Sequence, residues 1–275
     1  MVKSVPFTRQ FGFELEFLCE GVSQPRLKES VETVSGERAE IHDHGHQYNN
    51  NEWVVKTDSS CGWEVASRVM SSVADLKKAV KVVQAMHRAG AKVDNRCGLH
   101  VHVEVTDFSR DTLATLIQWW VKFERFTCDV LDPSRKNNSY CRPIGEYFQA
   151  ERSYDTDQTM YEVNGRRNAL NTTHYDARKT IEFRIAQGTS DFVNIKNWVR
   201  FLLTFVEFAK TAPRPDNVEY LLPQEVLTAM GLLGDELSNG VIEMRTWLLD
   251  SALKHAENDN DRKLIQAVQE RVSYD

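Results

Sequence analysis

The stretch Phe11-Gly12-Phe13-Glu14-Leu15-Glu16-Phe17-Leu18 alternates between large apolar residues and small or acidic ones. In a β-strand, successive side chains point to opposite faces, so residues two apart share a face. Residues 10–18 are therefore a predicted strand, with its aromatic and leucine side chains on one face and Glu14 and Glu16 on the other. This strand predicts a sheet that has one apolar face and one face carrying carboxylates.

The same alternation recurs along the chain. Further strands are predicted over residues 53–56, 63–67, 99–105, 167–171 and 180–185. The polar side chains at the alternating positions are Glu14 and Glu16, Glu64, His100 and His102, and Glu182 and Arg184. One such strand is typical of any half-exposed antiparallel sheet. A solvent-facing surface usually mixes Thr, Lys, Ser and Gln, however, whereas this set is rich in carboxylates and imidazoles. Gathered carboxylates raise one another's pKa unless cations neutralise them, so the set predicts a metal site.

The residue types indicate which metal the site would take. Carboxylate oxygens with one or two imidazoles suit hard divalent ions such as Mg²⁺ or Mn²⁺. Zinc is the competing ion, because His100 and His102 with one glutamate could form a catalytic zinc site. The sequence has no H-E-x-x-H helix signature, which disfavours a zinc protease. Arg184 would be left to hold an anionic group through its two-pronged guanidinium.

Helical periodicity separates the strands. Helices are predicted over residues 73–89, 111–131 and 191–210, and the chain becomes helical to its end after Pro213 and Pro215. Residues 20–51 and 132–165 are polar and are predicted to be long loops. Mixed strands and helices followed by a helical tail favour the α+β class. We expect a catalytic domain over residues 1–210 and a helical extension over residues 211–275 that packs on the same domain.

Composition narrows the classes of partner and compartment. The chain has 275 residues, with 34 Lys and Arg against 40 Asp and Glu, giving a formal net charge of −6. This acidic balance disfavours general nucleic-acid binding, which requires a basic face. The five cysteines include no C-x-x-C pair, which argues against a disulfide framework or zinc ribbon. With no apolar signal segment or membrane-length run, we expect a cytoplasmic protein without membrane association.

Five motifs in this order resemble the amidoligase family, which belongs to the carboxylate–amine ligase group with glutamine synthetase and glutamate–cysteine ligase. The matching pieces span roughly residues 8–190. They are Phe11–Glu16, Trp53–Ser60 with Glu64–Ser67, Cys97–Val103, Asn168–Asn171, and Thr180–Arg184 with Gly188-Thr189. In one place the chain departs from the family, because Asp58-Ser59-Ser60 stands where Asp-Gly-Ser is common. If that turn requires a positive φ, Ser59 carries backbone strain.

The resemblance implies a fold and a set of site residues. The fold is a curved, mainly antiparallel sheet of the glutamine synthetase catalytic-domain type, with helices on its outer face and a helical C-terminal tail. Its concave face would hold ATP and two or three Mg²⁺ or Mn²⁺ ions. The implied candidate metal ligands are Glu14, Glu16 and Glu64, then His100 or His102, and Glu182. Arg184 would contact phosphate and act in catalysis, Asp58 would hold or deprotonate the amine, and Asn168 and Asn171 would contact the nucleotide.

The predicted activity is ATP-dependent formation of an amide or isopeptide-like bond through an acyl phosphate. The substrates would be a carboxylate and an amine, each a small molecule or a peptide, and oligomer formation is compatible with the sequence. One alternative is a zinc- or iron-dependent hydrolase or oxygenase that uses His100, His102 and a carboxylate. Another is a non-catalytic nucleotide- or peptide-binding module. Two further clusters remain open: the histidine tract at residues 42–46, and the arginines that flank residues 132–165, either of which could be plain surface.

Overall fold

The structure is a computed structural model that describes residue 4 and residues 7–42, 51–163, 165–234 and 236–273. Contacts within the chain divide it into two compact units. The first, here called the sheet unit, comprises Phe7–Glu104 and Glu182–Lys196. The second, here called the helical unit, comprises Met1–Pro6, Val105–Ile181 and Asn197–Asp275. These limits differ from the functional boundary predicted at residue 210, which stays a prediction.

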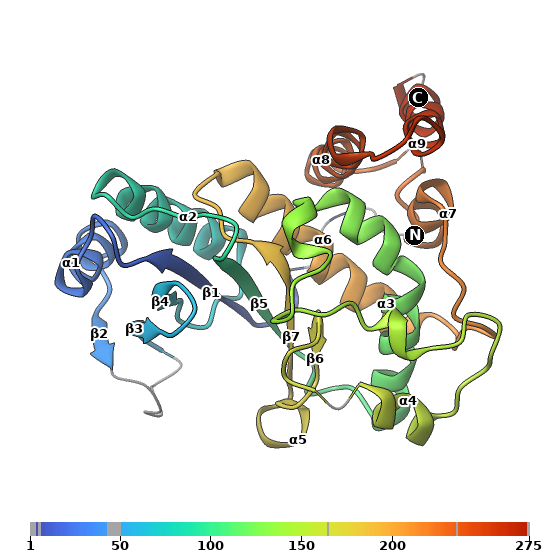
Figure 1. Ribbon diagram of the computed structural model, residues 1–275, viewed down its shortest axis with the longest axis horizontal. Helices are drawn as coiled ribbons and strands as arrows, with labels where there is room; N and C mark the ends of the chain where they lie inside the picture. Colours follow the sequence, from blue (N-terminus) through green and yellow to red (C-terminus); the bar gives the residue numbers. More distant parts are fainter. Residues whose placement is uncertain (1–3, 5–6, 43–50, 164, 235, 274–275) are drawn as a thin grey trace. The chain divides into compact units, whose positions relative to one another are not determined.

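A seven-stranded sheet runs in the order β2-β3-β4-β1-β5-β7-β6 (Figure 1). Its strands are β1 (Phe11–Leu18), β2 (Ala39–His42), β3 (Trp53–Asp58), β4 (Gly62–Ala66), β5 (Gly98–Glu104), β6 (Leu170–Asn171) and β7 (Thr180–Gln187). The four neighbouring strands β3, β4, β1 and β5 pair antiparallel with one another in that order. Edge strand β2 pairs parallel with β3. The sheet and its helices confirm the α+β class. Among the predicted strands, the one over residues 167–171 is much shorter in the structure, where β6 comprises only Leu170–Asn171.

The predicted alternation is present in the strand register. Leu15 lies opposite Val65 on β4 and Leu99 on β5, which aligns one continuous apolar row. Leu15, Val65 and Val101 have no exposed surface. Because the side-chain period of a strand is two, this register places the polar residues of all these strands on the opposite face. A shift of one residue would bury the carboxylates in the apolar core, so the pattern specifies the register strongly.

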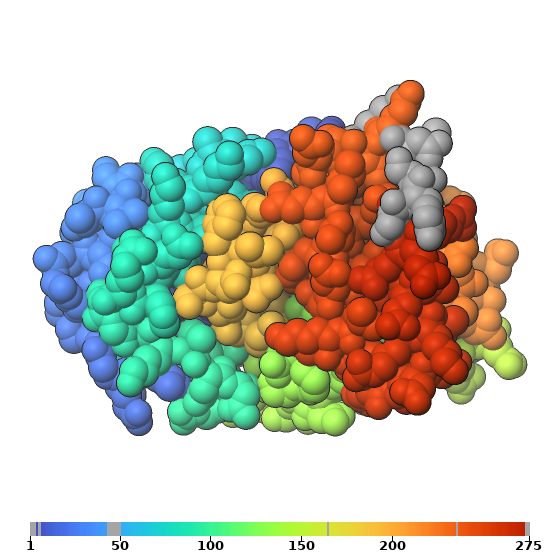
Figure 2. Space-filling model, turned by 90° about the horizontal axis from the view of Figure 1, so that it is seen from above, coloured from blue at the N-terminus to red at the C-terminus, as the bar shows by residue number. Residues whose placement is uncertain are grey.

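Helices α1 (Gln24–Ser35) and α2 (Val73–Arg88) lie together on one side of the sheet unit, and α1 also contacts β2 and β3 (Figure 1). In the space-filling view their outer faces form the blue and teal surface (Figure 2). Ser72 caps the start of α2, since its side chain accepts a hydrogen bond from the Asp75 backbone N–H. The apolar stripe of α2 is buried, including Leu76, Val80 and Val83, whereas Val73 in its first turn is exposed.

The prediction of a long loop over residues 20–51 is wrong for its described part, which contains α1 and β2. Helix α1 buries only Leu27, Val31 and Ser35, so its apolar periodicity is too sparse to recognise. Pro25 and Gly36 resemble loop punctuation but stand in the helix's first turn and at its C-cap, where Gly36 has a φ of 67°.

The helical unit is built around α3 (Arg110–Val130), which contacts α4, α7 and α8. Its other helices are η1 (Pro133–Arg135), η2 (Gly145–Tyr147), α4 (Thr156–Glu162), α5 (Tyr175–Arg178), α6 (Phe192–Thr211), which begins in the sheet unit, α7 (Pro223–Ala229), α8 (Asn239–His255) and α9 (Asp259–Ser273). Aromatic rings join α3 to α6, with Phe123 stacked on Phe208. Across the described residues, no helix is both long enough and apolar enough to cross a bilayer. The predicted helices match α2, α3 and α6 closely, whereas the helical tail resumes only at Pro223.

Candidate active site

The polar face of the sheet unit collects side chains from four strands. β1 carries Glu14 and Glu16, β4 carries Glu64, β5 carries His100 and His102, and β7 carries Glu182 and Arg184. Glu14 lies opposite His100, and Glu16 lies opposite Glu64, so the antiparallel register alone sets these residues side by side. The structure thus brings together all six predicted metal ligands and the predicted phosphate-binding arginine.

Glu14, His102 and Glu182 form the group best arranged to hold a cation. Nε2 of His102 lies 3.6 Å from Oε1 of Glu14 and 3.9 Å from Oε1 of Glu182. One ligand atom from each residue lies within 4.8 Å of the other two. Two carboxylate oxygens and an imidazole nitrogen at these separations fit a divalent metal ion.

His100 lies deeper, with only 3% of its surface exposed. Its Nε2 is 3.5 Å from Oε1 of Glu16, and its Nδ1 is 3.5 Å from Oε1 of Glu182. Nδ1 makes no hydrogen bond with any residue that the structure describes. A buried ring nitrogen between carboxylates needs a partner, and a bound cation or its water would supply one. These residues therefore fit the metal ions that the sequence predicts.

Neighbouring cations keep two of the carboxylates ionised. Burial raises the pKa of Glu14, but His102, His100 and Lys56 outweigh it and hold this pKa well below its ordinary value. Burial also raises the pKa of Glu182, yet His102, His100 and Arg184 bring it below the ordinary value. Both groups are consequently carboxylates at neutral pH, which is the form that binds metal.

The pKa values of two other groups are raised. Burial lowers the pKa of His102, but the charges of Glu14 and Glu182 raise it more. Burial raises the pKa of Glu64, as does the charge of Glu14, while Lys56 opposes this increase. A divalent ion at the site would replace protons on such groups, because metal binding requires deprotonated ligands.

Glu16 and Asp58 are oriented by hydrogen bonds from the chain. Oε2 of Glu16 accepts the Gly98 backbone N–H at 2.6 Å and the Cys61 thiol at 3.7 Å. Oδ1 of Asp58 accepts the backbone N–H of Ser60 at 2.7 Å and of Cys61 at 2.8 Å. Burial raises the pKa of Asp58, but a hydrogen bond from the Ser60 hydroxyl, together with those from the two backbone N–H groups, lowers it below its ordinary value.

Glu16, Asp58 and Cys61 form a second group with ligand atoms within 4.8 Å of one another. A hydrogen bond with Cys97, burial and the charge of Glu16 all raise the pKa of the Cys61 thiol. The thiol therefore stays protonated at neutral pH and is a poor metal ligand. The remaining donors are carboxylate oxygens, which suit Mg²⁺ or Mn²⁺, and imidazole nitrogens, which also suit zinc. The side chain of Cys97 is fully buried.

The expected strain at Ser59 is absent, since Lys179 is the one described residue other than glycine with a positive φ. The turn between β3 and β4 instead takes its positive φ at Gly62, where φ is 127°. A Cβ at Gly62 would lie 2.7 Å from the Cβ of Cys19. The departure from Asp-Gly-Ser is tolerated because the glycine requirement falls at the start of β4.

Lys56 is a site residue that the sequence interpretation did not assign. Its Nζ lies 2.6 Å from Oε1 of Glu64 and 3.7 Å from Oε1 of Glu14. Lys56 and Glu64 are cross-strand partners on β3 and β4. The signal was available, because Lys56 and Glu64 are equally distant from the predicted turn centred on residue 60.

The predicted nucleotide contacts Asn168 and Asn171 belong to the helical unit, where their side chains are buried. Asn168 Nδ2 donates to the Val163 carbonyl at 3.1 Å, and Asn171 Oδ1 accepts the Thr173 backbone N–H at 3.0 Å. Both amides thus stabilise local chain turns, and their nucleotide role stays a prediction. Of the histidine tract, His42 pairs with Glu40 at 2.7 Å, and residues 43–50 lie outside the described residues.

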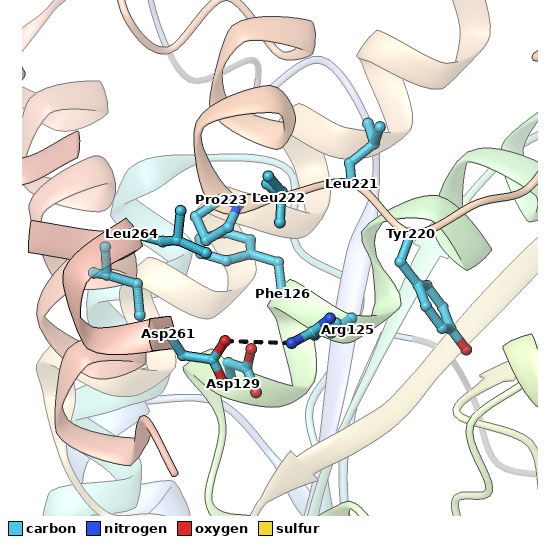
Figure 3. Close-up of a pocket in the computed structure, with 10 residues that line it drawn as sticks. Arg125, Phe126, Asp129, Tyr220, Leu221, Leu222, Pro223, Asp261 and Leu264 are labelled. Atoms are coloured by element: carbon cyan, nitrogen blue, oxygen red, sulfur yellow. Dashed lines mark hydrogen bonds and ion pairs between the residues drawn. The ribbon is translucent and has the colours of Figure 1, made fainter. Parts of the chain in front are cut away.

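A pocket in the helical unit, lined by residues of α3, α7 and α9 and the chain before α7, is a weaker candidate (Figure 3). Arg125 and Asp261 form an ion pair across it at 3.3 Å, and Phe126, Leu222 and Leu264 supply apolar walls. The cavity measures about 30 Å³, which is the space of one water molecule. Such a cavity cannot hold a nucleotide.

Comparison with known proteins adds three solved structures and one family. A complex of the prokaryotic ubiquitin-like protein Pup with its ligase PafA matches with a TM-score of 0.38 and 12% identity, covering 99% of this chain and 64% of that one. A bifunctional glutathione synthetase from Pasteurella multocida matches with a TM-score of 0.47 and 10% identity, covering 98% and 53%. A structure described as a novel glutamine synthase homolog matches with a TM-score of 0.43 and 12% identity, covering 96% and 70%.

The chain spans less than two thirds of the first two of these proteins. No curated protein matches the chain. Residues 8–206 match the family described as "Putative amidoligase enzyme", and this segment contains every candidate residue of the polar face. The chain therefore belongs to the amidoligase family.

Proposed function

We propose that this chain is an ATP-dependent carboxylate–amine ligase that forms an amide or isopeptide-like bond through an acyl phosphate. The observation that carries the proposal is the sheet face on which the carboxylates, two imidazoles and Arg184 converge. Family membership supports the same reaction class. The substrates would be a carboxylate and an amine, each a small molecule or a peptide.

The residues of the polar face fit Mg²⁺ or Mn²⁺. Glu14, His102 and Glu182 would hold one ion, with Glu16 and Glu64 as further carboxylate donors. When bound, such ions would neutralise the phosphate oxygens of ATP during phosphoryl transfer. The chain's own contribution is to fix these ligands on paired strands, which hold them more precisely than loops do.

Arg184 would bind a phosphate oxygen of the nucleotide or of the acyl phosphate. Its Nη1 pairs with Oε1 of Glu182, which orients the guanidinium on the same face as the carboxylates. Burial lowers the pKa of Arg184, but the charge of Glu182 raises it by more. The net pKa is therefore above its ordinary value, and the guanidinium stays cationic. A preoriented guanidinium stabilises developing negative charge without reorganising at the moment of reaction.

Asp58 would hold the amine substrate. Because its pKa is lowered, Asp58 is a carboxylate at neutral pH and a weak base. Its role in the proposal is therefore to attract the ammonium form and position it, and proton removal would fall to another group. Ser60 and Cys61 restrain Asp58 through hydrogen bonds, which gives the carboxylate a defined direction.

The proposal is tested by incubating the protein with ATP, Mg²⁺ and pools of carboxylates and amines. We expect substrate-dependent release of ADP and phosphate, together with a product lighter than its two substrates combined by one water. Glu16→Gln and Arg184→Ala should each abolish turnover, and circular dichroism should show that both variants remain folded. Failure of every pool to yield ADP, combined with tight zinc retention, would contradict the ligase and favour the zinc hydrolase alternative.

Two matched variants control for general effects of charge removal in the sheet unit. Glu40→Gln removes a carboxylate from edge strand β2, where Glu40 pairs with Arg38 and His42. Arg96→Ala removes an exposed arginine that pairs with Asp94 at 2.8 Å. Both variants should keep wild-type turnover. Wild-type rates in Glu16→Gln or Arg184→Ala would remove that residue from the site.

A further inference from the structure

Lys56 stands among the carboxylates of the polar face because of its strand register. On β3 it is the direct cross-strand partner of Glu64, and Glu64 is in turn the partner of Glu16 on β1. The three side chains therefore form one row across the sheet whatever ligand is bound. In this row, Nζ of Lys56 lies 2.6 Å from Glu64 and reaches Glu14 at 3.7 Å.

Lys56 and the two carboxylates that it contacts are largely buried, which strengthens the electrostatic interaction between them. The Lys56 side chain is 20% exposed, and those of Glu14 and Glu64 are 17% and 9% exposed. Water screens these buried charges less than it screens the charges of an exposed ion pair. An ammonium that touches two carboxylates occupies the same electrostatic position as a cation bound between them.

The cationic side chains of this face offset only part of its negative charge without metal. The carboxylates are Glu14, Glu16, Glu64 and Glu182, and the cations that pair with them are Lys56 and Arg184. Metal-ligating imidazoles are neutral, so they add no charge in the loaded site. With all four carboxylates deprotonated in the metal-loaded site, four negative charges against the two positive charges of Lys56 and Arg184 leave an excess that one divalent ion neutralises.

The geometry also favours one resident ion. The Glu14, His102 and Glu182 group offers converging ligand atoms for it. In the other group, Oε2 of Glu16 accepts the Gly98 N–H and Oδ1 of Asp58 accepts the Ser60 N–H. Those oxygens are already stabilised by N–H donors of the chain itself.

We propose that Lys56 is a built-in cation of this site, so that the chain without nucleotide holds one divalent ion in place of two. The inference deepens the proposed function. It rests on that function only in assuming that any further metal ions bind together with ATP. Lys56 acts here as a positioning residue, since it holds Glu64 and Glu14 together.

The test counts Mn²⁺ ions in the full chain without nucleotide, by calorimetric titration and by the electron paramagnetic resonance of free Mn²⁺. We expect about one ion in the wild type and about two in Lys56→Met, because removing the ammonium leaves Glu14 and Glu64 to bind a second ion. Lys56→Arg retains the charge and should hold one. Two ions in the wild type, or equal numbers in wild type and Lys56→Met, would overturn the inference.

Two further variants separate charge from disturbance of the fold. Lys28→Met removes a lysine that pairs with Glu32 on helix α1, and it should leave the Mn²⁺ count at one. Lys56→Met combined with Glu64→Gln removes both partners and should return the count to about one. A double variant that still holds two ions would contradict the assignment. Absence of ligation alongside the expected counts would refute the ligase and leave the metal count standing.

Discussion

At the scale of single residues, Glu37 shows how one half-buried carboxylate can join several elements of the sheet unit. Its side chain accepts hydrogen bonds from Arg68 at 3.0 Å, Lys78 at 2.9 Å and Trp53 at 3.0 Å. These partners come from β3, the chain after β4, and α2, while Glu37 itself follows α1. Burial raises the pKa of Glu37, but its partners lower it to about 2.

Glu37→Gln should therefore destabilise the protein in a pH-dependent way. A carboxyl whose folded pKa is lowered stabilises the fold above its unfolded pKa, and this contribution disappears as the pH falls through the folded value. After allowance for solvent screening, we expect a loss of about 1–2 kcal/mol at neutral pH. In urea unfolding, the difference between wild type and variant should shrink from about pH 5 to about pH 2.

The control for Glu37 is Glu29→Gln, which removes a carboxylate that pairs with Arg26 on exposed helix α1. Both side chains of that pair are more than half exposed, at 58% and 63%, so we expect a change within about 0.5 kcal/mol. A loss in Glu37→Gln that is independent of pH would contradict the ionic explanation.

At the scale of elements, the β3–β4 hairpin decides where Asp58 and Glu64 point. Gly62 enters β4 with a φ of 127°, and its α-carbon hydrogen faces Cys19 on the neighbouring segment. A side chain there would both strain the backbone and clash with Cys19. The register of Lys56 and Glu64 across the hairpin depends on this turn.

Gly62→Ala should accordingly lower the free energy of unfolding by about 2–4 kcal/mol and weaken Mn²⁺ binding, because the hairpin must move. Thermal unfolding and Mn²⁺ titration measure the two effects. Gly36→Ala is the matched control, since Gly36 also has a positive φ, of 67°, but nothing lies within 4 Å of its added Cβ. That control should cost about 1 kcal/mol and leave Mn²⁺ binding unchanged. Equal effects of the two variants would show that close packing at Gly62 is unimportant.

At the scale of the whole molecule, the two compact units divide the chain's chemistry. Every predicted metal ligand lies in the sheet unit, and the pocket of Figure 3 lies in the helical unit. A ligand that binds only the folded site stabilises the segment that forms it, by about 2.7 kcal/mol at a hundred times its dissociation constant. Metal binding should therefore stabilise the strands of the sheet unit that form the site and leave helices α8 and α9 of the helical unit unchanged.

Hydrogen–deuterium exchange with and without saturating Mn²⁺ tests this expectation. Amides of β1 and β5 should gain protection, whereas those of α8 and α9 should exchange at unchanged rates. Glu14→Gln with Glu182→Gln should remove the gain, because the cation group loses two ligands. Protection of α8 and α9 without protection of β1 would place the ion outside the polar face.

The strands that carry the site are predictable from the sequence alone. The alternation in Phe11–Leu18 predicts both the strand and the common face of Glu14 and Glu16, because the strand period is two for any residues. Helices α2 and α3 were equally predictable, since each has a long apolar stripe and a serine cap. Helix α1 was missed because it buries few side chains, so its stability comes mainly from packing against α2 and β3.

Which polar groups of different hairpins meet depends on the folded sheet. Strand order places β1 between β4 and β5, and this order brings His100 and Glu64 to Glu16. Local periodicity contains no information on strand order, which depends on long-range packing of the apolar face. The pKa of each carboxyl follows from the same long-range contacts, because burial and neighbouring charges act through space. The residue types of the site could therefore be predicted from the sequence, whereas the distances between them depend on the fold.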